Sequence, residues 1–113
     1  MTTAVRPRRA RVVLSRDVIA ATAMDLTLEQ PTTPLTLAAL GAVLGADPTA
    51  LYRHYRSRDD LMLDLADRMY AEVIELERPD LAGRESLPLS AHTIRDVFLR
   101  RPALAAEVGS RFT

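Results

Sequence analysis

The chain has 113 residues, of which 27% are charged, and its formal net charge is zero. This length fits one small domain, or such a domain with part of another, and leaves no comfortable room for a separate catalytic domain. The absence of cysteine excludes disulfides and thiolate metal sites. No apolar run is long enough to cross a bilayer and no signal peptide is recognisable, so we expect cytoplasmic residence without membrane contact.

The charges are divided unevenly along the chain. Residues 1–58 hold eight arginines and four acids, a net charge of +4, whereas residues 59–113 hold seven arginines and eleven acids, a net charge of −4. The first part therefore has the charge of a phosphate binder. The second part would be repelled by nucleic acid, and we expect it to face solvent or another protein.

Residues 1–14 form a polar, arginine-rich arm, which we expect to be flexible in the absence of nucleic acid. Two interpretations stay open for this arm: entry into a DNA minor groove, or a solvated tail that adds only nonspecific attraction. Ser15 can cap a first helix that runs to about Leu28 and is closed by Pro31 and Pro34. Its predicted inner positions are Val18, Ile19, Ala23 and Leu26.

Two short helices joined by a glycine turn are predicted next. Thr36 can cap the first helix, and Gly45 suits the left-handed turn that ends it. Asp47 and Pro48 favour the start of a second helix directly after the turn. The predicted inward residues are Leu37, Leu40, Gly41 and Leu44 on the first helix and Leu51 and Tyr55 on the second. This arrangement is typical of a helix-turn-helix unit that presents its second helix to the DNA major groove.

A long helix is predicted from Arg58 or Asp59 to about Glu77, with Ser57 as its cap. Its predicted buried residues are Leu61, Leu65, Met69 and Val73, with Met62 and Leu76 alongside and Tyr70 as a further core residue. Its acidic residues Asp64, Asp67, Glu72, Glu75 and Glu77 are interpreted as a solvated surface. Residues 78–88 read as a linker, followed by helices over about 90–100 and from about 102 onward. The first of these helices is expected to bury Ile94, Val97 and Phe98, and the second carries the apolar residues Leu104, Ala105 and Val108.

Two motifs in this region resemble a known family. They are LYRHY at residues 51–55 and SRDDL at residues 57–61, preceded by the capped helix and its glycine turn. From about residue 15 to residue 70 the chain resembles the N-terminal DNA-binding domain of TetR (tetracycline repressor) family transcriptional regulators. It departs from that pattern at Gly41, where relatives usually carry alanine.

The resemblance implies a repressor that binds a two-fold symmetric operator as a homodimer and is released by a small-molecule effector. In TetR-like proteins further helices enclose the effector and form the dimer. We therefore expect either a truncated chain or a reduced member of the family. On its own the chain is expected to be a monomer or a weak dimer, with firm dimerisation in any full-length form.

The resemblance assigns phosphate contacts to four residues. Tyr52 and His54 match residues that approach the phosphate backbone, and Thr36 and Arg58 match positions that bind phosphate on either side of the groove. Each has an alternative role, since Tyr52 suits a core position as well. A lone histidine such as His54 is often simply a satisfied surface or core group.

Three residues are candidates for base contacts. Arg53 is the best candidate for reading a base edge, because its planar fork matches guanine, although it can instead clamp a phosphate. Thr49 and Ala50 lie at the start of the second helix, where helix-turn-helix proteins touch bases, and Ala50 can meet a thymine methyl group.

These observations predict an all-α protein. The expected parts are a flexible arm (residues 1–14), a three-helix, homeodomain-like helix-turn-helix domain (15–58), and a connecting helix with a truncated ligand-binding and dimerisation region (59–113). We predict a sequence-specific DNA-binding transcriptional regulator without cofactor, metal or catalytic role, because Asp59, Asp60 and Asp64 have no partnering nucleophile. The alternative function is a protein-interaction module that does not bind specific DNA. A small-molecule sensor is a weaker third possibility.

Overall fold

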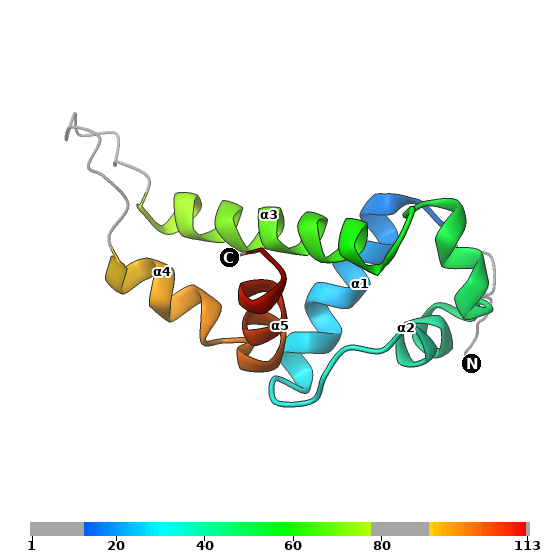
Figure 1. Ribbon diagram of the computed structural model, residues 1–113, viewed down its shortest axis with the longest axis horizontal. Coiled ribbons are helices and arrows are strands. Elements are labelled where there is room, and N and C mark those ends of the chain that lie inside the picture. The colour runs from blue at the N-terminus through cyan, green and yellow to red at the C-terminus, as the bar shows by residue number, and fades with distance from the viewer. Residues whose placement is uncertain (1–12, 78–90, 113) are drawn as a thin grey trace, which may run out of the picture.

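Figure 1 shows the computed structural model, which describes residues 13–77 and 91–112. Within these ranges every regular element is a helix, which confirms the all-α prediction. The elements are α1 (Arg16–Glu29), α2 (Leu37–Leu44), the 3₁₀ helix η1 (Pro48–Arg53), α3 (Arg58–Glu77), α4 (Ala91–Phe98) and α5 (Pro102–Phe112). The predicted linker and most of the predicted arm lie outside the described residues.

Helix α1 begins and ends where its sequence predicts. The Val18 backbone N–H donates to the Ser15 hydroxyl at 3.1 Å, which satisfies one of the free donors of the first turn. Ile19 and Ala23 are fully buried as predicted, but burial also extends to other positions. The additional buried residues are Ala20, Met24 and Thr27. The buried face is wide because α1 packs against α2 on one side and α3 on another.

The helix-turn-helix unit forms around Gly45, whose φ of 68° is the left-handed conformation that glycine adopts without strain. The Ala46 N–H donates to the Gly41 carbonyl at 2.9 Å, which closes the end of α2. Asp47 caps the next helix by accepting from the Thr49 N–H at 2.8 Å.

The second predicted helix of the unit is present, but it is not an α-helix. It is a 3₁₀ helix, in which the Ala50 N–H donates to the Asp47 carbonyl at 2.8 Å, three residues back. A segment this short consists mostly of helix ends, where bonds three residues apart replace the α pattern. Leu51 and Tyr55 are buried as predicted, so the inward face is retained.

The long helix α3 carries the centre of the core. Its predicted buried positions are confirmed for Leu61, Met62, Leu65, Met69 and Val73. Two predictions for α3 are wrong, because Tyr70 is 44% exposed and Leu76 is 56% exposed. Figure 1 shows α4 and α5 on one side of α3, and α1 crossing α3 near its start.

Helix α5 is joined to α1 and α3 through Arg101, which is only 4% exposed. Its guanidinium donates to the Met24 carbonyl at 3.1 Å and to Glu72 at 3.2 Å. The Ala103 N–H adds a bond to the Pro31 carbonyl at 3.0 Å. Glu72 was expected on a solvated acidic surface, and it instead neutralises a buried arginine.

Candidate nucleic-acid interface

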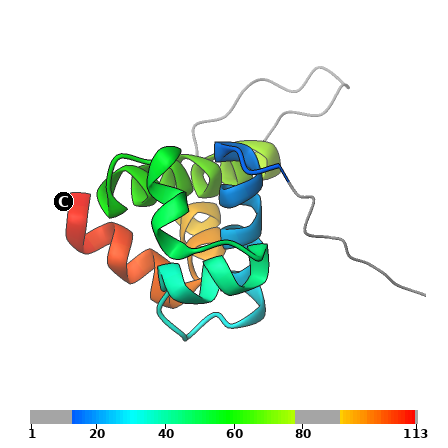
Figure 2. The same cartoon turned by 90° about the vertical axis from the view of Figure 1, so that its right-hand side faces the viewer.

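Most of the predicted DNA contacts lie on η1 or directly after it, at the end of the molecule that faces the viewer in Figure 2. Tyr52 is 47% exposed, so its ring is not a core residue. Thr49 and Arg53 are exposed as well, and Ala50 and His54 are half-buried. Because Leu51 anchors η1 from inside, these five side chains occupy the surface that the helix turns outward.

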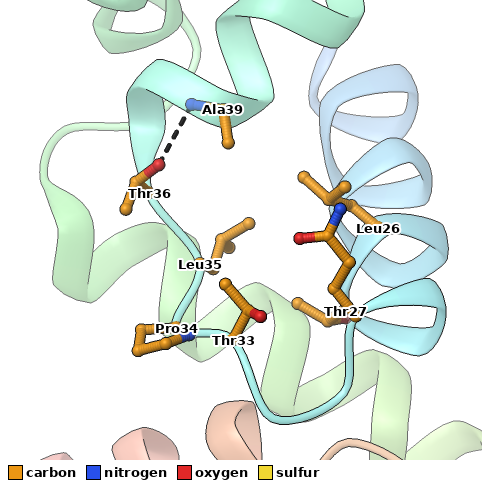
Figure 3. Close-up of a pocket in the computed structure, with 8 residues that line it drawn as sticks. Leu26, Thr27, Thr33, Pro34, Leu35, Thr36 and Ala39 are labelled. Carbon is orange, nitrogen blue, oxygen red and sulfur yellow. Dashed lines mark hydrogen bonds between the residues drawn. The ribbon is translucent and has the colours of Figure 1, made fainter.

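Thr36 stands at the start of α2, where its hydroxyl accepts from the Ala39 N–H at 3.0 Å (Figure 3). The hydroxyl proton is left to donate to another acceptor, such as a phosphate oxygen. A small cavity of about 90 Å³ lies beside it, between the end of α1, the loop and α2. The residues that line it are Leu26, Thr27, Gln30, Thr33, Pro34, Leu35, Thr36 and Ala39. This cavity is well below the size of pockets for drug-sized ligands.

Thr49 is held in one orientation by the cap of η1. Its hydroxyl donates to Asp47 at 2.7 Å while its N–H donates to the same carboxylate oxygen. These two bonds lower the pKa of Asp47, with the hydroxyl contributing most. With its proton committed, the Thr49 hydroxyl presents lone pairs outward, which suits an amino group on a base edge.

The turn after η1 is fixed from α1 by Arg16. One guanidinium nitrogen donates to the His54 carbonyl at 2.8 Å and to Asp60 at 3.2 Å. The same group stacks over the Tyr55 ring, 4.2 Å from its centroid. Arg16 is one of the positive charges expected to serve phosphate binding, and in the structure it stabilises this turn instead.

Tyr55 and Asp60 complete this anchor. The Tyr55 hydroxyl donates to the Arg16 carbonyl at 3.0 Å and to the Asp64 carboxylate. Burial, followed by the bond to Asp64, raises the pKa of Tyr55 above its ordinary value. Asp60 accepts from the Arg56 N–H at 2.9 Å, and this bond together with Arg16 lowers the pKa of Asp60. Asp64, expected on a solvated acidic surface, therefore belongs to the support of η1.

Arg58 matches a phosphate-binding position, but its guanidinium is already occupied. Nε donates to Glu107 at 2.7 Å, and one terminal nitrogen donates to the other Glu107 oxygen at 2.8 Å and to the Leu35 carbonyl at 2.6 Å. The bonds to Glu107 raise the pKa of Arg58. Glu107 also accepts from Arg111 at 3.0 Å, and Arg111 in turn pairs with Asp59.

Two arginines of this end remain available. Arg53 and Arg56 are exposed, and neither forms an ion pair within residues 13–77 and 91–112. Arg56 was not among the predicted contact residues. Its place between His54 and Arg58 in a run of basic residues was the signal that could have identified it.

The described residues contain no cluster of three or more His, Asp or Glu side chains suited to a metal ion. None of the helices in that part of the chain is long and apolar enough to cross a membrane. The side chains of the candidate interface carry hydroxyl, guanidinium, imidazole and small apolar groups. Groups of these kinds bind phosphates and base edges.

The chain is similar to three curated proteins, each 30% identical to it over 101 residues. Two are named helix-turn-helix (HTH)-type transcriptional repressors, from Mycobacterium tuberculosis strains H37Rv and CDC 1551. The third is named an uncharacterized HTH-type transcriptional regulator, from Mycobacterium bovis. The alignments cover 88% of this chain and 39% of each relative, so the chain spans about two fifths of their length. No family model and no solved structure matches the chain.

Proposed function

We propose that the chain is the DNA-binding part of a transcriptional repressor of the TetR type. The observation that carries this proposal is the position of the side chains of residues 49, 50 and 52–54 on the surface of the molecule. The helix that carries most of them follows a glycine turn, and Tyr55 and Arg16 hold it in place through hydrogen bonds. The similarity to proteins named HTH-type repressors supports it. A helix that is short, exposed and rigidly held is what insertion into a major groove requires.

The proposed division of roles follows from exposure and hydrogen bonding. Arg53 reads a guanine through its free fork, and Thr49 and Ala50 meet neighbouring bases from the start of η1. Thr36, at the start of α2, donates to a phosphate.

Three further side chains complete the proposed contact with the backbone of the duplex. Tyr52 and His54 bind phosphate from η1, and Arg56 adds a charge-assisted contact beside them. Arg58 contributes only when it leaves Glu107.

Dimerisation and effector binding belong to the same proposal. A single η1 of six residues covers little DNA, and two copies on successive major-groove faces of one operator bind far more tightly than one. In a TetR-type repressor, a small-molecule effector releases the operator. A regulator of this kind acts in the cytoplasm, where chromosomal DNA is accessible.

The test is a binding titration of the chain on random duplex DNA at about 50 and 200 mM salt. We expect affinity to fall steeply with salt, and Arg56→Ala to lower the log–log slope by about 0.9, the value of one phosphate contact. The matched control is Arg95→Ala, which removes the same charge from an exposed position on α4 and should leave the slope unchanged.

Affinity that does not depend on salt, or no affinity for any duplex, would contradict the proposal. It would favour the alternative, a protein-interaction module, for which α3 offers exposed apolar side chains. These are Leu63, Tyr70, Ile74 and Leu76.

A further inference from the structure

Arg58 connects three parts of the molecule that are distant in sequence. It is the first residue of α3, Glu107 belongs to α5, and Leu35 directly precedes the cap of α2. The Arg58 and Glu107 side chains are 28% and 22% exposed, so solvent reaches the pair from one side. The contact is therefore a half-buried bridge between α5 and the helix-turn-helix unit.

Glu107 occupies one of the two edges with which a guanidinium binds phosphates, the edge formed by Nε and a terminal nitrogen. Nε–H and one terminal N–H of Arg58 point in parallel at the two carboxylate oxygens, at 2.7 and 2.8 Å. Arginine grips carboxylates and phosphates with this same pair of donors, so one edge serves only one of them at a time. Glu107 therefore occupies an edge of Arg58 at which a DNA phosphate would otherwise bind.

Release of Arg58 has a limited electrostatic cost. Glu107 keeps a second cation, because the Arg111 guanidinium donates to it at 3.0 Å from one turn further along α5. A carboxylate that retains a partner avoids the large penalty of an isolated, half-buried charge. On release, Arg58 would exchange the Glu107 carboxylate for a DNA phosphate. Release would break the bonds of Arg58 to Glu107 and to the Leu35 carbonyl, and contacts with DNA would have to replace them.

We propose that Glu107 is an intramolecular competitor of DNA phosphate for Arg58, so that α5 limits the affinity of the helix-turn-helix unit for DNA. This inference rests on the proposed function, because it names a residue that regulates the same DNA contact. Glu107, in the acidic part of the chain, would thus affect DNA binding without contacting the duplex itself.

The test compares Glu107→Gln with Asp67→Asn in the whole 113-residue chain. Both variants remove one negative charge, but Asp67 lies exposed on α3 and has no bond to Arg58. We expect Glu107→Gln to tighten binding to random duplex by about twofold to fivefold, the range of a partly exposed ion pair. Its log–log salt slope should steepen by about 0.9, because one more arginine reaches a phosphate.

Removal of Arg58 separates this effect from a general change in charge. Arg58→Ala should weaken duplex binding more in the Glu107→Gln background than in the native chain, and should abolish the gain. Equal affinities for Glu107→Gln and Asp67→Asn, or a gain that persists without Arg58, would overturn the proposal while leaving the proposed function intact. Failure of every variant to bind duplex would refute the proposed function and this inference with it.

A measurement on the native chain covers the case in which Glu107→Gln unfolds. The Arg58 Nε–H is hydrogen-bonded, so its NMR signal is observable, and it can be assigned by its loss in Arg58→Lys. We expect this signal to shift as duplex is added, in proportion to the bound fraction. A signal that stays unchanged at saturation with duplex shows that Arg58 never leaves Glu107, and would overturn the proposal.

Discussion

Replacement of Gly41 by alanine tests the packing of the helix-turn-helix unit. A Cβ at Gly41 would lie 2.6 Å from the Ala46 carbonyl oxygen and 3.4 Å from the Pro48 ring. Ordinary contacts between carbon and oxygen begin at roughly 3.3 Å, so the turn would have to shift by several tenths of an ångström. The obstacle is backbone, which cannot rotate away as a flexible side chain does. Gly41 is therefore retained here for close approach.

Two opposing effects decide the expected size of the change. Alanine gains roughly 1 kcal/mol over glycine inside a helix. Overpacking in a tightly packed region typically costs about 1–3 kcal/mol, and here the shift would also strain the bond from the Ala46 N–H to the Gly41 carbonyl. We expect the clash to win. The free energy of unfolding should fall by about 1 kcal/mol, within a range set by how far the turn can relax.

The measurement is urea unfolding of the variants followed by circular dichroism. The matched control is Gly109→Ala, because Gly109 also lies in a helix and a Cβ there meets nothing within 4 Å. That variant should gain up to about 1 kcal/mol, the helix propensity alone. If Gly41→Ala proved as stabilising as Gly109→Ala, the close contact between α2 and the turn would be refuted.

Three further predictions concern the anchor and the interface. Tyr55→Phe should cost about 1–3 kcal/mol of unfolding free energy in the same urea assay, because the Asp64 carboxylate and the Arg16 carbonyl lose a buried donor. The pKa of Asp60 is lowered in the folded state, so its stabilisation is present above about pH 4 and is lost as pH falls through the lowered value. Acid titrations of the native chain should therefore show a steeper loss of stability below pH 4 than titrations of Asp60→Asn. Selection from random duplexes should show that Arg53→Ala loses preference at one base position and about 1–3 kcal/mol on the preferred site, and unchanged selectivity would assign Arg53 to phosphate instead.

Features set by neighbours in sequence were predictable. The caps by Ser15 and Thr36, the left-handed Gly45 and the start at Pro48 all depend on residues within one turn, and each is present. Apolar residues at every fourth position predicted the buried face of α3, because this pattern also depends only on residues close in sequence. The 3₁₀ form of η1 was not predictable from this pattern, because the spacing of Leu51 and Tyr55 is that of an α-helical turn and Tyr55 lies beyond the end of η1.

Burial and hydrogen bonds that depend on residues distant in sequence were not predicted correctly. Tyr70 was predicted to be buried, but whether an apolar side chain on α3 is covered depends on where other helices pack, and Tyr70 remains 44% exposed. Asp64 and Glu72 were taken as solvated because they follow the polar face of α3. Their partners, Tyr55 and Arg101, come from other elements.

The number of arginines that are free to contact DNA also depends on residues distant in sequence. The net charge of +4 for residues 1–58 counted every arginine as a potential phosphate contact. Folding pairs Arg16 with Asp60 and Arg58 with Glu107, partners 44 and 49 residues away, which no local pattern reveals. Within residues 13–58 this leaves Arg53 and Arg56 as the exposed, unpaired cations. Because duplex affinity follows the number of phosphates neutralised, an internal carboxylate that holds one of the paired arginines lowers the affinity.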